Sequence, residues 1–227
     1  MKERRTALGL SLGLALAGIG CGHPESKVVD QYFRALNAQD SQTLSSFAVV
    51  SLDTKGKRVD KWTIIEASEE SRQPSPLGDL IRKLKDAEAA LAAHNKDWNA
   101  YKLEHYNELE KVRDLLKANG KIPAGLTAVA AEYEKVNQDD RELKKAVSEA
   151  KDAVEKEKRN ESLSVGTSDG LEDLSGDMVT KQLDLALTIG SETQNYVMTL
   201  RKYDVSAAGQ QGPRPMNRWV VFSLQPK

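Results

Sequence analysis

The side chains best able to do chemistry in this chain are few and widely spaced. Cys21 is the only cysteine among 227 residues, and the histidines are His23, His94 and His105. A single thiol forms neither a disulfide within the chain nor a zinc site built on cysteines. The sequence also lacks a nucleophile elbow, a phosphate-binding glycine loop and an HExxH motif. We therefore expect a protein that is not an enzyme and that holds no metal and no cofactor.

The charges are balanced, with 33 basic and 34 acidic side chains. Such a balance creates no field strong enough to attract a polyanion, so we expect no nucleic-acid partner.

The first twenty residues have the pattern of an export signal. MKERR is basic, and TALGLSLGLALAGIG is apolar but too short to span a bilayer as a helix. Arg4 and Arg5 are compatible with twin-arginine export, although adjacent arginines also occur in ordinary signals. We expect residues 1–20 to be a signal peptide.

Cys21 follows this apolar segment at the end of the run AGIGC. The run resembles the lipobox of bacterial lipoproteins, with Gly20 and Ile19 before the cysteine and Gly18 where that family usually has Leu. The resemblance implies that Cys21 becomes the first mature residue and carries a diacylglycerol and an N-acyl chain. Several acyl chains attach a protein durably, because each buried CH₂ contributes about 0.8 kcal/mol. Ordinary signal cleavage and an uncleaved anchor are the alternatives.

Residues 21–27 are then a lipidated tether to the bilayer. Gly22 follows the cysteine, and by resemblance to lipoprotein sorting in Gram-negative bacteria the absence of Asp there favours the outer membrane, facing the periplasm, over the inner membrane.

The mature chain begins and ends with segments typical of a small α+β domain. Residues 28–47 predict two helices, the second capped by Asp40 or Ser41, and residues 59–68 predict a strand. From Val179 to Ile189 apolar side chains alternate with polar ones, among them a solvated Asp184, and strands near 195–205 and 218–227 follow. Consecutive strands joined by turns indicate an antiparallel meander.

Between these segments, residues 74–161 predict a long antiparallel coiled-coil hairpin. Apolar residues recur at spacings of three and four on both sides of the break KANGKIPAG. Each helix would be about 50–60 Å long at 1.5 Å per residue, so the hairpin must project from the domain that carries it.

The run YFRALNAQD at Tyr32–Asp40 and the final RWVVFSL resemble the nuclear transport factor 2-like superfamily. The resemblance implies a cone-like fold, in which a curved antiparallel sheet packs on the N-terminal helices. Residues 28–73 and 162–227 would form this cone-like domain, and residues 74–161 would be an insertion. In that family the cone can hold an apolar small molecule.

One polar group is expected in the seam of the hairpin. If the break is centred near Lys121, Tyr101 and His105 lie opposite Asp140. A carboxylate in a seam costs several kcal/mol unless it is paired, so a His105–Asp140 pair that fixes the register is predicted. A solvent-exposed Asp140, and a proton switch or metal ligand, are the alternatives.

Trp98 and Tyr106 are the candidate protein-contact residues of the hairpin, with packing in the seam as the alternative. Together these features predict a membrane-anchored envelope lipoprotein of the interaction or scaffolding type, whose helical arm contacts an unknown envelope protein. Binding of an apolar small molecule in the cone, with conversion of that molecule the less favoured form, is the alternative function. Self-association through the arms is also open.

Overall fold

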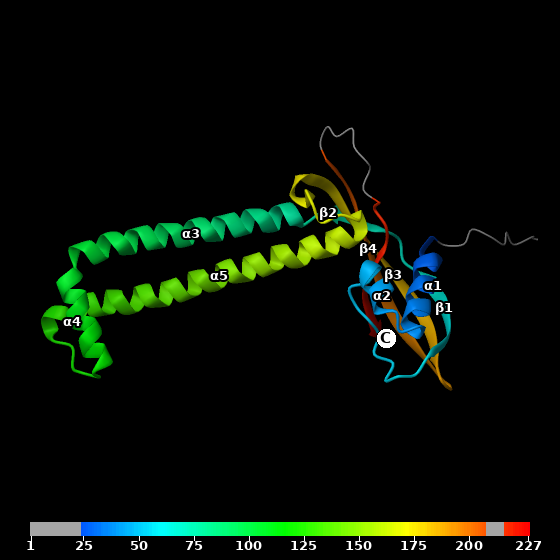
Figure 1. The fold of residues 1–227 in the computed structure, drawn as a ribbon, viewed down its shortest axis with the longest axis horizontal. Helices are drawn as coiled ribbons and strands as arrows, with labels where there is room; N and C mark the ends of the chain where they lie inside the picture. Colours follow the sequence, from blue (N-terminus) through cyan, green and yellow to red (C-terminus); the bar gives the residue numbers. More distant parts are fainter. Residues whose placement is uncertain (1–23, 208–215) are drawn as a thin grey trace, which may run out of the picture.

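A computed structural model describes residues 24–207 and 216–227. An antiparallel sheet carries two short helices on one side and a long helical arm that projects from the other end of the molecule (Figure 1). We define the arm as residues 77–165. Residues 1–20 and Cys21, to which the signal peptide and the lipid anchor were assigned, lie outside the described residues.

The two N-terminal helices form where the sequence predicts them. α1 (Pro24–Asn37) begins four residues before the expected start at Val28, with a proline at its first position, where a missing N–H has no intrahelical partner to lose. α2 (Ser41–Phe47) is capped by Asp40, whose carboxylate accepts a hydrogen bond of 2.9 Å from the backbone N–H of Thr43.

Within the described ranges, five strands form one open antiparallel sheet in the order β1-β3-β4-β5, with β2 also paired to β3. The strands are β1 (Val59–Ala67), β2 (Ser71–Pro74), β3 (Leu174–Ile189), β4 (Glu192–Ala207) and β5 (Val220–Pro226). β3 and β4 are each 16 residues long and stay in register from Leu174–Ala207 to Ile189–Glu192. The tight turn between them places Gly190 at a φ of 63°, which glycine adopts without steric cost.

The α+β class and the antiparallel meander of β3, β4 and β5 are thereby confirmed. The strand expected over residues 59–68 is β1. β2 was not predicted, because its sequence SRQP shows no alternation of apolar and polar residues; all four of its residues are exposed. Asp184 is not simply solvated, because it accepts a hydrogen bond from Lys227 at the end of the chain.

The long strands serve two apolar clusters that lie on opposite faces of the sheet. Near the β3–β4 turn, Leu185 and Met198 point toward α1 and α2 and are fully buried with Phe33. At the other end, Tyr203 and Val205 pack under the arm. They are an odd number of residues from Met198 along β4, so their side chains lie on the opposite face of the sheet. Each half of the sheet therefore supports a different set of helices.

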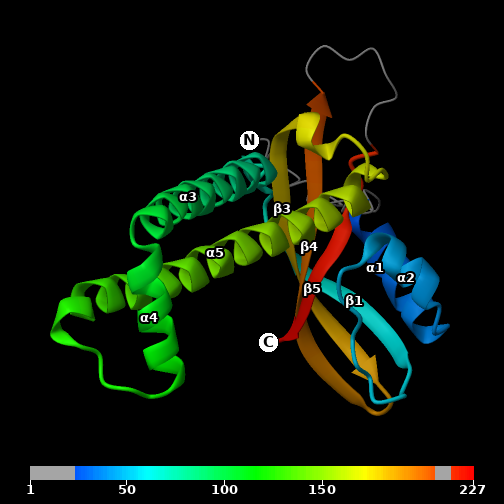
Figure 2. The ribbon, with the colours of Figure 1, turned by 60° about the vertical axis from the view of Figure 1, so that its left-hand side comes forward.

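The arm consists of α3 (Leu77–Glu104), α4 (Tyr106–Lys117), the short 3-10 turn η1 (Ala124–Leu126) and α5 (Thr127–Val165). α3 and α5 lie side by side and run in opposite directions, and the end of α5 crosses the sheet (Figures 1 and 2). α5 has 39 residues, so it is about 60 Å long. It ends at Gly166, a left-handed cap with a φ of 86°.

Truncation of a core side chain between the sheet and α1 tests this arrangement. We expect Leu185→Ala to lower the free energy of unfolding by about 3 kcal/mol, because the side chain is fully buried and its loss leaves a cavity. Ile65→Ala is the control, since Ile65 is 58% exposed on β1. Chemical denaturation measures both variants, and equal losses would contradict the packing described.

Candidate functional site

The far end of the arm, away from the sheet, departs from a straight pair of helices. His105 separates α3 from α4, with a φ of −116° and a ψ of 28° that no α-helix accommodates. α4 then folds across the arm and buries Leu109 and Val112 against Val129 and Ala130 of α5 (Figure 2). The expected break at KANGKIPAG is present between α4 and η1, but the break at His105 was not predicted. We call this end, residues 98–133, the arm tip.

The fold-back of α4 changes the register that the sequence suggested. Trp98 lies against Tyr133, with ring centroids 6.2 Å apart, so the end of α3 faces α5 about two turns before Asp140. His105 packs against Tyr101 at 4.3 Å between ring centroids. Asp140 instead accepts a hydrogen bond of 2.8 Å from Lys144 in the next turn of α5. Within the described residues, no hydrogen bond or ion pair joins His105 to Asp140.

The two candidate contact residues of the arm, Trp98 and Tyr106, have different environments. Trp98 is half-buried and stacks on Tyr101 at 5.6 Å, so it belongs to the packing inside the arm tip. Tyr106, the first residue of α4, is 61% exposed, and Leu103 is 84% exposed. Leu103 was not singled out from the sequence. Leu103 and Tyr106 together flank the break at His105.

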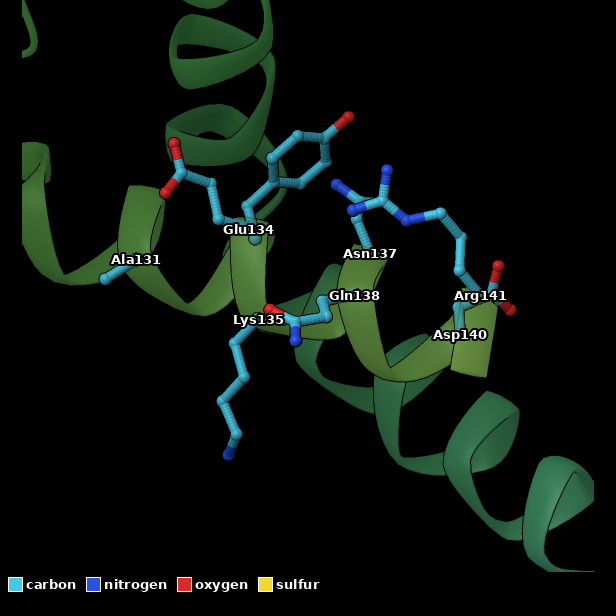
Figure 3. A pocket seen from close by; sticks show the side chains of 8 residues that line it. Ala131, Glu134, Lys135, Asn137, Gln138, Asp140 and Arg141 are labelled. Atoms are coloured by element: carbon cyan, nitrogen blue, oxygen red, sulfur yellow. The ribbon is translucent and has the colours of Figure 1, made fainter. Parts of the chain in front are cut away.

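A hollow of about 820 Å³ runs along α5 beside the arm tip (Figure 3). Its walls carry side chains of both signs, including Glu134, Lys135, Asp140 and Arg141, together with the amides Asn137 and Gln138. Glu134 and Lys135 point to opposite sides of the helix in this view. With charges of both signs and more polar than apolar surface, the hollow is a solvated helix face rather than a pocket shaped for a small molecule.

A second group of polar side chains lies at the other end of the arm, where α5 meets the sheet. Glu157, Asn160, Glu161 and Ser164 are all buried, and their spacing of three, four and seven residues places them on one face of α5. We call these residues, with Ser75 and Tyr203, the root cluster. The spacing was available in the sequence, but charged positions on a long helix were attributed to its solvated face.

Hydrogen bonds within the root cluster join the arm to β4. The Tyr203 hydroxyl donates to one oxygen of Glu157 at 2.5 Å, and the Asn160 amide donates to the other at 3.4 Å. Ser164 donates through its hydroxyl to the carbonyl of Arg218 at 2.8 Å and accepts from the backbone N–H of Tyr203 at 2.9 Å. These groups fix the height and rotation of α5 on the sheet.

Burial also shifts the protonation of this cluster. Burial of the Glu161 carboxyl raises its pKa to about 7; the hydrogen bond of 3.1 Å from the Ser75 hydroxyl opposes the shift, and the charge of Glu157 adds to it. The pKa of the Tyr203 hydroxyl is raised by burial and by its hydrogen bond to Glu157, so it remains a donor at every physiological pH. The cluster is enclosed between helix and sheet, so these groups have no access to a substrate and act on the arm itself.

No group of three or more His, Cys, Asp or Glu is placed to hold a metal ion in the part of the chain that the structure describes. None of the helices in residues 24–207 and 216–227 combines the length and apolarity needed to cross a bilayer.

Comparison of the chain with protein-family models, with curated proteins and with solved structures gave no match.

Removal of one hydroxyl tests the attachment of the arm. We expect Tyr203→Phe to lower the free energy of unfolding by about 2 kcal/mol, because Glu157 remains buried and loses its shortest hydrogen bond. Tyr196→Phe is the matched control on the same strand, since its hydroxyl makes only a 3.3 Å hydrogen bond to Gln194. A calorimetric scan in which the two variants lose equal stability would argue against the role given to Glu157.

Proposed function

We propose that this protein is a non-enzymatic envelope lipoprotein, anchored through acylated Cys21, that uses its arm tip to contact another envelope protein. The observation that carries the proposal is the projecting arm, which ends in an apolar pair on the surface, Leu103 and Tyr106. Large exposed apolar and aromatic side chains are common at the energetic centre of protein interfaces.

The distance between anchor and arm tip supports this proposal. α1 begins at Pro24, so Gly22 and His23 alone separate its first residue from Cys21. Three residue steps span at most about 11 Å, so an acylated Cys21 would hold the start of α1 close to the bilayer. The start of α1 and the arm tip lie toward opposite ends of the longest axis of the molecule (Figure 1). The arm would then place its contact surface well away from the anchor.

A cone-like domain interrupted by a coiled-coil hairpin is part of the same proposal. The sheet combines strands from both sides of the arm, since β1 and β2 precede it and β3, β4 and β5 follow it. This order, with α1 and α2 first, supports a cone-like domain of the nuclear transport factor 2-like type that is interrupted by the arm. Leu77, Leu80, Ile81 and Leu84 of α3 belong to the same apolar cluster as Val154 of α5, which supports a coiled-coil seam between the two helices.

Binding of an apolar small molecule is the alternative. Tyr32, Phe33, Leu185 and Met198 fill the space between the sheet and α1 and are fully buried, so a ligand there must displace them. A hollow of about 440 Å³ between α1 and β1, lined in part by Trp62, is the place where a small ligand would enter. Mass spectrometry of the natively purified protein distinguishes this alternative, because a bound ligand would co-purify.

Replacement of the cysteine tests the anchor. We expect Cys21→Ser to move the protein from the membrane fraction to the soluble fraction and to remove the mass of the acyl chains from the mature N-terminus, because serine offers no thiol for the thioether. Mass spectrometry and fractionation measure the two effects. An unmodified cysteine in the wild-type protein would disprove the anchor.

Charge substitution at the arm tip tests the contact. We expect the double variant Leu103→Asp and Tyr106→Asp to weaken capture of the envelope partner at least tenfold, because each buried apolar anchor contributes about 1–2 kcal/mol or more. Asn107→Asp is the control for each single variant, Leu103→Asp and Tyr106→Asp, since it adds one negative charge at an exposed neighbouring position without removing apolar surface. Cross-linking and pull-down from membranes measure capture.

Equal capture by the double variant and the control would contradict a contact through the arm tip. Light scattering on the same proteins separates a second copy of the chain from a different partner, because only self-association changes the mass of the purified protein.

A further inference from the structure

The root cluster places two buried carboxyl groups next to each other with only neutral hydrogen-bond donors. Glu157 is bound by the Tyr203 hydroxyl and the Asn160 amide, and Glu161 by the Ser75 hydroxyl. Glu161 is 1% exposed and Glu157 is 8% exposed. Neutral donors satisfy the oxygens of a carboxylate, but they do not compensate the buried charge.

One cation lies on the root face of the sheet. Arg201 has the same parity along β4 as Tyr203, and its charge opposes the rise in the pKa of the Tyr203 hydroxyl. Its guanidinium lies 3.4 Å from the centre of the Phe222 ring. Arg218 donates to the backbone carbonyls of Leu163 and Ser46. Ion pairs of the neighbouring elements near the root include Lys158 with Glu172, Arg72 with Glu70 and Asp204, Lys202 with Glu70, and Arg82 with Asp79. None of these cations forms an ion pair with Glu157 or Glu161 in the described residues.

Glu161 joins the two segments of the chain that attach the arm to the sheet. It lies on the last turns of α5, and its partner Ser75 lies in the link between β2 and α3. The backbone N–H of Ser75 in turn donates to the carbonyl of Gly176 on β3 at 2.9 Å. The contact therefore fastens the point where the chain leaves the sheet to the point where it returns.

We propose that Glu161 is a proton-operated latch, which holds the root of the arm closed on the sheet when its carboxyl is neutral and loosens it when the carboxyl is ionised. Ionisation places a second negative charge beside Glu157 in a site where, within the described residues, neither carboxyl forms an ion pair with a cation. The inference concerns the attachment of the arm alone, so it holds whether or not the arm tip contacts another protein.

The direction of the pH effect follows from the protonation of the closed state. The pKa of Glu161 is raised in the closed state from its ordinary value of 4.5 to about 7, so the closed root binds more protons than the open root between these values. Its stability is greatest below about pH 4.5, falls as the pH rises toward about 7, and is then constant.

Hydrogen exchange of the full-length mature protein in detergent tests the latch. After correction for intrinsic exchange rates, we expect protection of the last turns of α5 and of the Ser75 link to fall about tenfold between about pH 6 and about pH 8.5. In Glu161→Gln, a neutral side chain of equal size, we expect protection to stay constant. Glu155→Gln, an exposed position on the same helix, should retain the wild-type pH dependence.

A second variant keeps the test decisive if Glu161→Gln does not fold. Glu157→Gln removes the neighbouring charge, so we expect the midpoint of the protection loss to move to lower pH. Constant protection in the wild-type protein, or the same pH dependence in Glu161→Gln and wild type, would overturn the latch. An unchanged midpoint in Glu157→Gln would overturn the coupling between the two carboxyls.

Discussion

The continuous pairing of β3 with β4 is the interaction on which the rest of the molecule depends. On β3, Val179 to Ile189 contribute to the cluster under α1 and α2, whereas Leu174 and Met178 contribute to the cluster under the arm. One part of the ladder therefore serves the body, which we define as the sheet with α1 and α2, and the other part serves the arm. Because side chains alternate between the faces of a strand, the two halves present opposite faces to their helices. The arm can then pack on one face of the sheet while α1 and α2 pack on the other.

The parts of this fold that depend on local pattern are readable in the sequence. Alternation from Val179 to Ile189 defines β3, and the cap at Asp40 defines the start of α2. The break at His105 is of another kind, because the residues around it are compatible with a continuous helix. It exists because α4 gains burial of Leu109 and Val112 when it folds back onto α5, and that gain involves residues twenty positions or so away in the chain.

The same reasoning explains why the root cluster was missed. Glu157 and Glu161 sit in a segment rich in charged residues, and most charges on such a helix are solvated. Their burial follows from the position of β4, which no local pattern encodes. Residues of this type are thus predictable as members of one helix face, but their environment is decided by the tertiary structure. The predicted partner of Asp140 was wrong for the same reason. Asp140 accepts a hydrogen bond from Lys144 rather than from His105, because the register of two paired helices depends on the whole segment that joins them.

The way the arm is inserted has a consequence for how such a protein can evolve. Pro74 of β2 is the residue-level partner of Asp177 of β3, so the chain leaves and re-enters the body at neighbouring positions. Whole turns added to or removed from α3 and α5 together would change the reach of the arm while both ends remain where they are. The sheet with α1 and α2 would then stay unchanged, while the length of α3 and α5 would set how far the arm tip lies from it.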